Sequence, residues 1–146
     1  MKKLIVTFFM VAAYGLVSMA QTQPATPVDS SKMSEITFDN IVHDFGKIEF
    51  AGDGTTKFNF KNTGKSPLVL NNVQSSCGCT IPEWPREVVE PGASKTITVT
   101  YNTRRTGVFT KTVTVYSNAK NGTIYLTIKG EVGPEPATTP APAPGN

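Results

Sequence analysis

The chain has 146 residues, with 14 Lys and Arg against 11 Asp and Glu, and it contains two cysteines and one histidine. Loss of Lys2 and Lys3 with a leader would leave 12 basic residues against the 11 acidic ones, so the mature chain is nearly neutral. This balance argues against binding to nucleic acid or to anionic membranes, both of which need a basic surface.

The first twenty residues have the pattern of an export signal. Lys2 and Lys3 precede an apolar run. In Ser18-Met19-Ala20, small residues occupy the minus-three and minus-one positions of a cleavage site before Gln21. A membrane-spanning helix needs about 20 apolar residues, and polar residues interrupt this run. We therefore expect residues 1–20 to be a cleaved signal peptide. The mature protein is expected to be periplasmic or secreted and not inserted in a membrane.

The composition divides the rest of the chain into three parts. Residues 21–34 are rich in Thr, Pro and Ser and predict a disordered linker, and residues 133–146 predict a disordered Pro-rich tail. Residues 35–132 lie between them, long enough for one hydrophobic core and too short for two.

Within residues 35–132, apolar and polar residues alternate between turn signals, which predicts strands and no helix. Asn121-Gly122 has the sequence of a two-residue type I′ hairpin turn. About seven short strands in one small domain predict an all-β, immunoglobulin-like β-sandwich with Greek-key connections. In chain order the expected strands and their inward residues are the segment Ile36 to Phe50, then Phe58 and Phe60, Leu68-Val69-Leu70, Ile97, Val99 and Tyr101, Phe109, Val113 and Val115, and Ile124, Leu126 and Ile128.

One irregularity occurs in the first expected strand. In a continuous strand, the odd-numbered Ile41, His43 and Phe45 would lie on one face of the sheet. The even-numbered Ile48 and Phe50 would lie on the other face. A β-bulge or a change of sheet at Gly46 would bring all five side chains toward one core.

An ordered set of short motifs runs across the domain. The motifs are His43-Asp44-Phe45-Gly46-Lys47-Ile48, Phe60-Lys61-Asn62-Thr63-Gly64 with Pro67-Leu68, Ser76-Cys77-Gly78-Cys79-Thr80, Pro91-Gly92 and Tyr116-Ser117-Asn118. The set resembles the bacterial family known as domain of unknown function 1573. The resemblance implies an exported, immunoglobulin-like domain akin to those of pilus chaperones, major sperm protein and cilium-associated modules, and it implies no established activity.

The Cys77-Gly78-Cys79 segment is the candidate site, and three interpretations remain open. The pair can form a small disulfide that shapes a bend, since Gly78 permits the required chain geometry. It can instead be a thiol-exchange site, although the spacing is not Cys-x-x-Cys and no helix is expected there. As a third option, two thiolates suit Cu(I), whereas zinc would need two further ligands and the chain has one histidine.

His43 is the candidate third ligand of such a copper site, because imidazole binds copper. The alternative is a core histidine with hydrogen-bond partners. Trp84, next to Pro85, either anchors a partner or covers one end of the sandwich.

The sequence contains no recognisable catalytic motif, so we do not expect an enzyme. We expect an exported binding or structural module of the cell envelope with no cofactor, whose partner is an envelope protein or another extracytoplasmic ligand. The alternative is a thiol-redox or copper-binding protein that uses Cys77 and Cys79.

Overall fold

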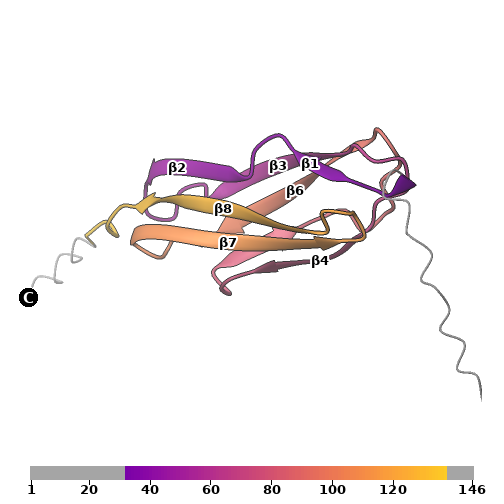
Figure 1. Ribbon diagram of the computed structural model, residues 1–146. Helices are drawn as coiled ribbons and strands as arrows, with labels where there is room; N and C mark the ends of the chain where they lie inside the picture. Colours follow the sequence, from indigo (N-terminus) through magenta and orange to yellow (C-terminus); the bar gives the residue numbers. More distant parts are fainter. Residues whose placement is uncertain (1–31, 138–146) are drawn as a thin grey trace, which may run out of the picture.

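Two four-stranded sheets pack face to face in the computed structural model, which describes residues 32–137 (Figure 1). The predicted signal peptide, most of the predicted linker and the end of the predicted tail lie outside the described residues. The first sheet has the order β1 (Ile36–Phe38), β3 (Thr55–Asn62), β6 (Ser94–Tyr101) and β5 (Thr80–Glu83). The second has the order β2 (Val42–Ile48), β8 (Thr123–Val132), β7 (Gly107–Ser117) and β4 (Leu70–Ser75).

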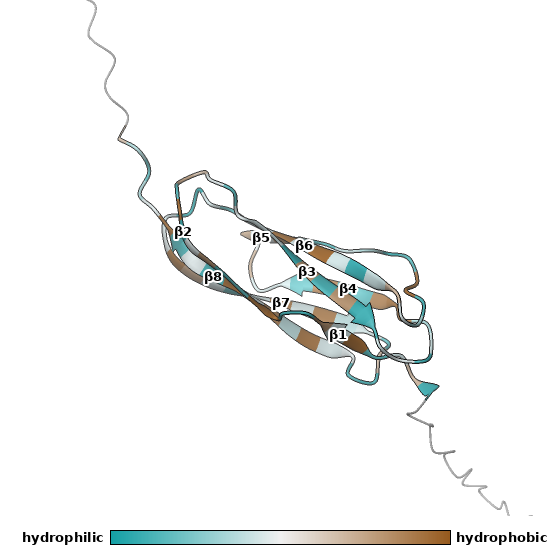
Figure 2. Cartoon of the chain, turned by 90° about the horizontal axis from the view of Figure 1, so that it is seen from above, coloured by the Kyte–Doolittle hydropathy of each residue, from teal (hydrophilic) through white to brown (hydrophobic). Residues whose placement is uncertain are grey.

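The alternating sequence pattern decides which side chains face the space between the sheets. Along β3, exposed and buried residues alternate without exception, and Figure 2 shows the matching change of hydropathy along the strands. The rings of Tyr101 and Phe109 stack across the core with centroids 3.8 Å apart. Of the expected inward residues, those with at most 6% exposure are Phe58, Phe60, Leu68, Leu70, Ile97, Val99, Tyr101, Phe109, Val113, Val115, Leu126 and Ile128.

The topology is that of an immunoglobulin-like sandwich. β3 pairs with β6 in one sheet and β4 pairs with β7 in the other, so the chain alternates between the sheets as in a Greek key. β2 runs parallel to β8. The all-β prediction is therefore confirmed, with eight strands instead of about seven. The additional strand is β5, which lies in a segment that has little alternation and contains Pro82.

The predicted irregularity at Gly46 is present as a break in register. The pairing of β2 with β8 shifts between Asp44 and Lys47, and Gly46 has a φ of 63°. Phe45 and Ile48 both pack against the core as a result. The prediction was wrong for Ile41, which is 50% exposed, because the chain changes sheet there, before β2 begins.

The connection between β7 and β8 differs from the predicted two-residue turn. Residues 118–122 form it, and Gly122 is not among the glycines with positive φ, so the type I′ prediction was wrong. The side-chain amide of Asn121 instead donates to the carbonyl of Ile36 at 2.8 Å and accepts the N–H of Ile36 at 3.2 Å. Asn121 thereby holds β1 in place, a contact that local sequence could not indicate.

The packed sandwich includes residues on both sides of the predicted boundaries. Ser34, placed in the linker by composition, is 3% exposed and its hydroxyl donates to Asn118 Oδ1 at 3.2 Å. At the other end, the N–H of Gly133 donates to the carbonyl of Ile48 at 2.8 Å. The described chain enters and leaves at opposite ends of the sandwich (Figure 1). Within residues 32–137, no helix is long and apolar enough to span a lipid bilayer.

Candidate functional site

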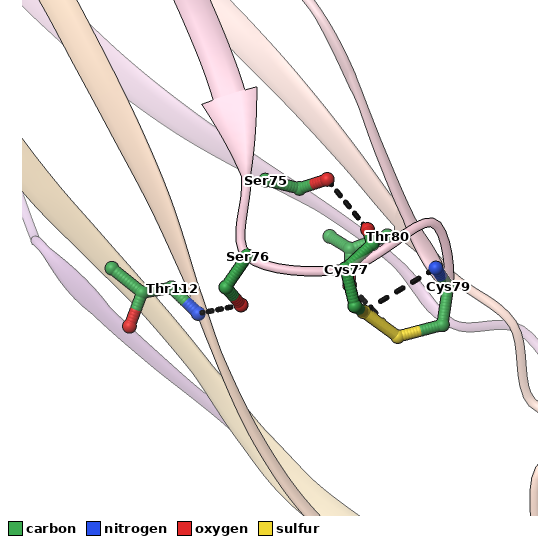
Figure 3. Close-up of a disulfide and its surroundings, with 6 residues drawn as sticks. All are labelled: Ser75, Ser76, Cys77, Cys79, Thr80 and Thr112. Carbon is green, nitrogen blue, oxygen red and sulfur yellow. Dashed lines mark hydrogen bonds between the residues drawn. A yellow bond between two sulfur atoms is a disulfide. The ribbon is translucent and has the colours of Figure 1, made fainter.

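Cys77 and Cys79 form a disulfide where the chain passes from one sheet to the other (Figure 3). β4 ends at Ser75 and β5 begins at Thr80, so the bridge lies in the connection between an edge strand of each sheet. The α-carbons of the two cysteines are 5.2 Å apart. This separation lies within the usual range for a disulfide.

Hydrogen bonds from neighbouring residues hold this connection in shape (Figure 3). The Ser75 hydroxyl donates to the carbonyl of Cys77 at 2.7 Å, and the N–H of Cys79 donates to Cys77 Sγ at 3.3 Å. The Thr80 hydroxyl lies 3.7 Å from Cys77 Sγ and 3.9 Å from Cys79 Sγ. Both sulfurs therefore have a polar neighbour that could donate to a thiolate.

The connection is accessible on one side only. Cys79 is 6% exposed and Thr80 2%, so both belong to the domain interior. Cys77 is half-buried and Gly78 is exposed, and a β-carbon added to Gly78 would meet no atom within 4 Å. A partner could therefore approach the bridge from the side of Cys77 and Gly78.

The edge of β4 leads directly to the bridge. The N–H of Ser76 donates to the carbonyl of Thr112 at 2.9 Å, which identifies this pair as a hydrogen-bonded one in the antiparallel ladder of β4 and β7. Because hydrogen-bonded and open positions alternate in such a ladder, Val73 and Ser75 direct their backbone N–H and C=O away from β7. These groups form an open edge beside Cys77.

β4 is the longest of the four edge strands that has neither a charged residue nor proline. Its pairing with β7 shifts once, between Leu70 and Asn72, and is regular from Val73 to Ser75. Asn72 and Gln74 are exposed. β1 has only three residues, and β5 has four with Pro82 among them, whereas β2 carries a bulge together with Asp44 and Lys47. Short length, proline, bulges and charges are the features that discourage pairing with another strand.

The structure does not bring His43 together with the cysteines. His43 pairs with Ile128 on β8, Ile128 pairs with Lys111 on β7, and the connection holding Cys77 lies beyond β7 at the opposite edge of the sheet. Three strand spacings correspond to about 14 Å, too far for shared ligation. The His43 ring is half-buried and packs edge-on against Phe45, with centroids 4.5 Å apart.

No cluster of three His, Cys, Asp or Glu side chains that could hold a metal ion occurs in the described part of the chain. The predicted set of Cys77, Cys79 and His43 is therefore not assembled. In the bridged form the two sulfurs are also not thiolates, the ligand form that Cu(I) requires. A copper site on the two cysteines would need the bridge to be reduced first.

Sequence reasoning missed a groove of about 340 Å³ beside the β2 bulge. Lys129 Nζ and Asp44 Oδ2 form an ion pair of 3.1 Å at this groove, and Val108, another lining residue, is 82% exposed. The N–H of Gly46 and then the Lys129 ammonium lower the pKa of Asp44. The lining of the groove combines residues of β2, β7 and β8, which lie far apart in the sequence, so no local pattern indicates it.

Trp84 lies after β5, half-buried against the core, and the guanidinium of Arg86 covers its ring at 3.8 Å from the centroid. Packing on the core fits the interpretation that it covers part of the sandwich. Its indole N–H is buried without a hydrogen-bond partner among the described residues.

The chain has the same fold as several proteins of low sequence identity. It is similar to a protein of unknown function from Porphyromonas gingivalis, with a TM-score of 0.63 and 14% identity over 72% of this chain and 50% of that one. It is also similar to the ASH/PapD-like domain 7 of human CEP192, with a TM-score of 0.57 and 13% identity over 78% and 96% of the two chains. A third similar structure is the YadV chaperone, with a TM-score of 0.51 and 10% identity over 70% and 54%.

These likenesses describe the fold alone, because identities this low carry no function with them. The chain spans only half the length of the Porphyromonas gingivalis protein. No curated protein has a significantly similar sequence. One family model matches the sequence from Ile36 to Val132, over the whole sandwich. The chain belongs to the DUF1573 family, which is described as a protein of unknown function.

Proposed function

We propose that this protein is an exported, non-enzymatic binding module of the cell envelope that captures an extended segment of a partner protein along the edge of β4. The observation that carries the proposal is the unprotected edge of β4, where Val73 and Ser75 present unpaired backbone groups. An added strand would extend the second sheet of the sandwich from four strands to five.

The exposed side chains on β4 suit a polar partner segment. Asn72 and Gln74 are neutral hydrogen-bonding residues, and they point to the outer face of the sheet, opposite to the buried Val73. In strand addition, main-chain hydrogen bonds give affinity and alternate side chains give specificity. A similar fold in a protein named a chaperone is consistent with binding to other proteins.

Export is the second part of the proposal. It is supported by the basic, apolar and small-residue segments of residues 1–20, which predict a signal peptide. The mature protein would begin at Gln21 and be released by osmotic shock or found in the medium. Recovery of the protein in the membrane with residues 1–20 still attached would exclude this part.

Site-specific photo-crosslinking of the full chain in its native cells tests the binding site. A photo-reactive residue at Gln74 should give a discrete covalent adduct with a partner protein. The matched control is Thr110, which is exposed on β7 of the same sheet but not on an edge strand. Equal adduct patterns from both positions, or none from Gln74, would exclude capture at β4.

A second variant separates loss of binding from loss of folding. The N–H of Ser75 points to the open edge, so Ser75→Pro removes a donor that a partner strand would use, at a position where edge strands accept proline. The expected result is a loss of the Gln74 adduct at an unchanged far-UV spectrum. An adduct that persists in Ser75→Pro would mean that the partner does not pair with β4.

A further inference from the structure

The bridge between Cys77 and Cys79 is not needed to hold its own loop. The N–H of Ser76 donates to the carbonyl of Thr112, and the N–H of Asn102 donates to the carbonyl of Cys79, both at 2.9 Å. These bonds attach the loop to β7 on one side and to the residue after β6 on the other. A disulfide that closes so small a ring also removes little entropy from the unfolded chain. We therefore expect the domain to keep its fold with the bridge open or closed.

The two sulfurs have different surroundings. Cys77 is half-buried beside the open space over Gly78, whereas Cys79 is only 6% exposed. Cys77 Sγ also accepts the N–H of Cys79 at 3.3 Å, a hydrogen bond that Cys79 Sγ lacks among the described residues, whereas the Thr80 hydroxyl lies 3.7 Å from Cys77 Sγ and 3.9 Å from Cys79 Sγ. Hydrogen bonds donated to sulfur stabilise the thiolate, which is the nucleophilic form. The accessible sulfur is thus also the one best prepared to carry negative charge.

From this asymmetry we propose that Cys77-Gly78-Cys79 is a thiol–disulfide exchange site for protein dithiols, in which Cys77 exchanges with the partner and Cys79 is the resolving cysteine. This activity does not depend on strand capture at β4. An exchange site requires an accessible sulfur, a stabilised thiolate and a fold that persists in both redox states. The loop between β4 and β5 combines all three.

The reaction is a two-electron exchange in two steps. A thiolate of the partner attacks Cys77 Sγ, the bond between the two cysteines breaks, and the electron pair leaves on Cys79 Sγ, which takes up a proton. The second partner thiolate then attacks the partner sulfur of the mixed disulfide and releases Cys77 as a thiolate, which takes up a proton from solvent. The partner dithiol becomes a disulfide, and the bridge becomes two thiols. The reverse sequence reduces a partner disulfide, with Cys77 as the nucleophile.

The first test asks whether the bridge opens in the folded protein. The mature chain is equilibrated in mixtures of reduced and oxidised glutathione, thiols are alkylated, and intact mass gives the oxidised fraction. We expect a complete titration at an unchanged near-UV circular dichroism spectrum. A bridge that is reduced only after urea has unfolded the domain would overturn the proposal.

The second test assigns the roles of the two sulfurs. The single variants Cys79→Ser and Cys77→Ser each keep one thiol, and their rates of mixed-disulfide formation with oxidised glutathione are compared at pH 7. Cys77 should react at least about tenfold faster than Cys79, because exposure and thiolate stabilisation both favour it. Equal rates or the opposite order would overturn the assignment. Where a variant does not fold, peptide mapping of glutathione trapped on the wild-type chain decides, and glutathione on Cys79 would contradict the proposal.

Thr80 is a positioning residue in this scheme, and its hydroxyl is tested through a pH profile. In the Cys79→Ser background, Thr80→Val should move the pH profile of Cys77 alkylation upward by about one unit, the value of one hydrogen bond to a charged group. Ser75→Ala is the matched control, because the Ser75 hydroxyl donates to the carbonyl of Cys77 and not to its sulfur. Equal shifts in the two variants, or none in Thr80→Val, would exclude the assigned role.

Discussion

The side-chain amide of Asn62 donates a hydrogen bond of 2.9 Å to the carbonyl of Val89, 27 positions further along the chain. The same amide nitrogen donates to the carbonyl of Ser66 at 2.9 Å, and the amide oxygen accepts the N–H of Gly64 at 3.0 Å. Asn62 is completely buried at the end of β3. It therefore joins the turn after β3 to the segment before β6.

Replacing Asn62 by Ala is expected to lower the free energy of unfolding by about 2–4 kcal/mol, because it leaves buried backbone groups without partners. The measurement is chemical denaturation followed by circular dichroism. Asn59→Ala serves as the control, since Asn59 is exposed on the same strand and its side chain accepts one exposed hydrogen bond, from Thr96, so that its loss should cost about 1 kcal/mol or less. A loss at Asn62 as small as that at Asn59 would contradict the assigned role.

The core register gives a second prediction. Phe60 is 1% exposed and packs against Phe38, with ring centroids 5.5 Å apart, whereas the adjacent Lys61 is exposed. Truncation of Phe60 to Ala should cost about 3–5 kcal/mol through the cavity that it leaves. Lys61→Ala should change stability by less than about 0.5 kcal/mol. Similar losses at the two positions, measured by urea denaturation, would be incompatible with this register.

Replacement by alanine is expected to destabilise the domain at Gly64 and to leave its stability nearly unchanged at Gly78. A β-carbon at Gly64 would lie 2.4 Å from the backbone nitrogen of Glu35 and 2.5 Å from the carbonyl oxygen of Met33. Gly64→Ala should therefore displace the segment before β1 and cost about 2 kcal/mol or more. Gly78→Ala meets no atom within 4 Å and should stay within about 0.5 kcal/mol of the wild type. Thermal or chemical denaturation of both variants checks the contrast.

The double variant Cys77→Ser, Cys79→Ser should remain folded and lose no more than about 2 kcal/mol. The reason is that loop-closure stabilisation falls with loop size and the ring here is minimal. The free energy of unfolding is compared with that of the oxidised wild type in the absence of reductant. Complete unfolding of the variant would mean that the bridge is structural and that the domain depends on it.

Asp44 should contribute to the loss of folding stability at low pH. Its pKa lies below the ordinary 3.8 because the N–H of Gly46 and then Lys129 favour the charged carboxylate. A lowered folded-state pKa stabilises the fold above the unfolded value, and this stabilisation is lost as the pH falls through the folded value. The isosteric Asp44→Asn variant should therefore lose less stability than the wild type on acidification below about pH 4. If the free energy of unfolding of the wild type and of Asp44→Asn fell equally with pH, Asp44 would not contribute to this loss of stability.

Much of the sandwich was predictable because strand faces follow a period of two. The alternation around Phe60, Val99 and Val115 identifies inward residues before any pairing is known. The same alternation indicated a β-bulge or a change of sheet at Gly46, and the structure has the break in register. β5 escaped prediction because its hydropathy does not follow its burial: the polar Thr80 is buried and the apolar Ile81 is 62% exposed.

The sequence by itself determined that the two cysteines can form a disulfide. One residue separates them, so their α-carbons lie within disulfide distance in a suitable local backbone conformation, whatever the rest of the fold. Tertiary structure alone decided that Cys77 is accessible while Cys79 is buried, and that the open edge of β4 ends beside them. It also placed His43 on β2, at the opposite edge of the sheet from the loop that holds Cys77. These relationships depend on strand order, which is set by contacts between residues far apart in the chain and leaves no local pattern.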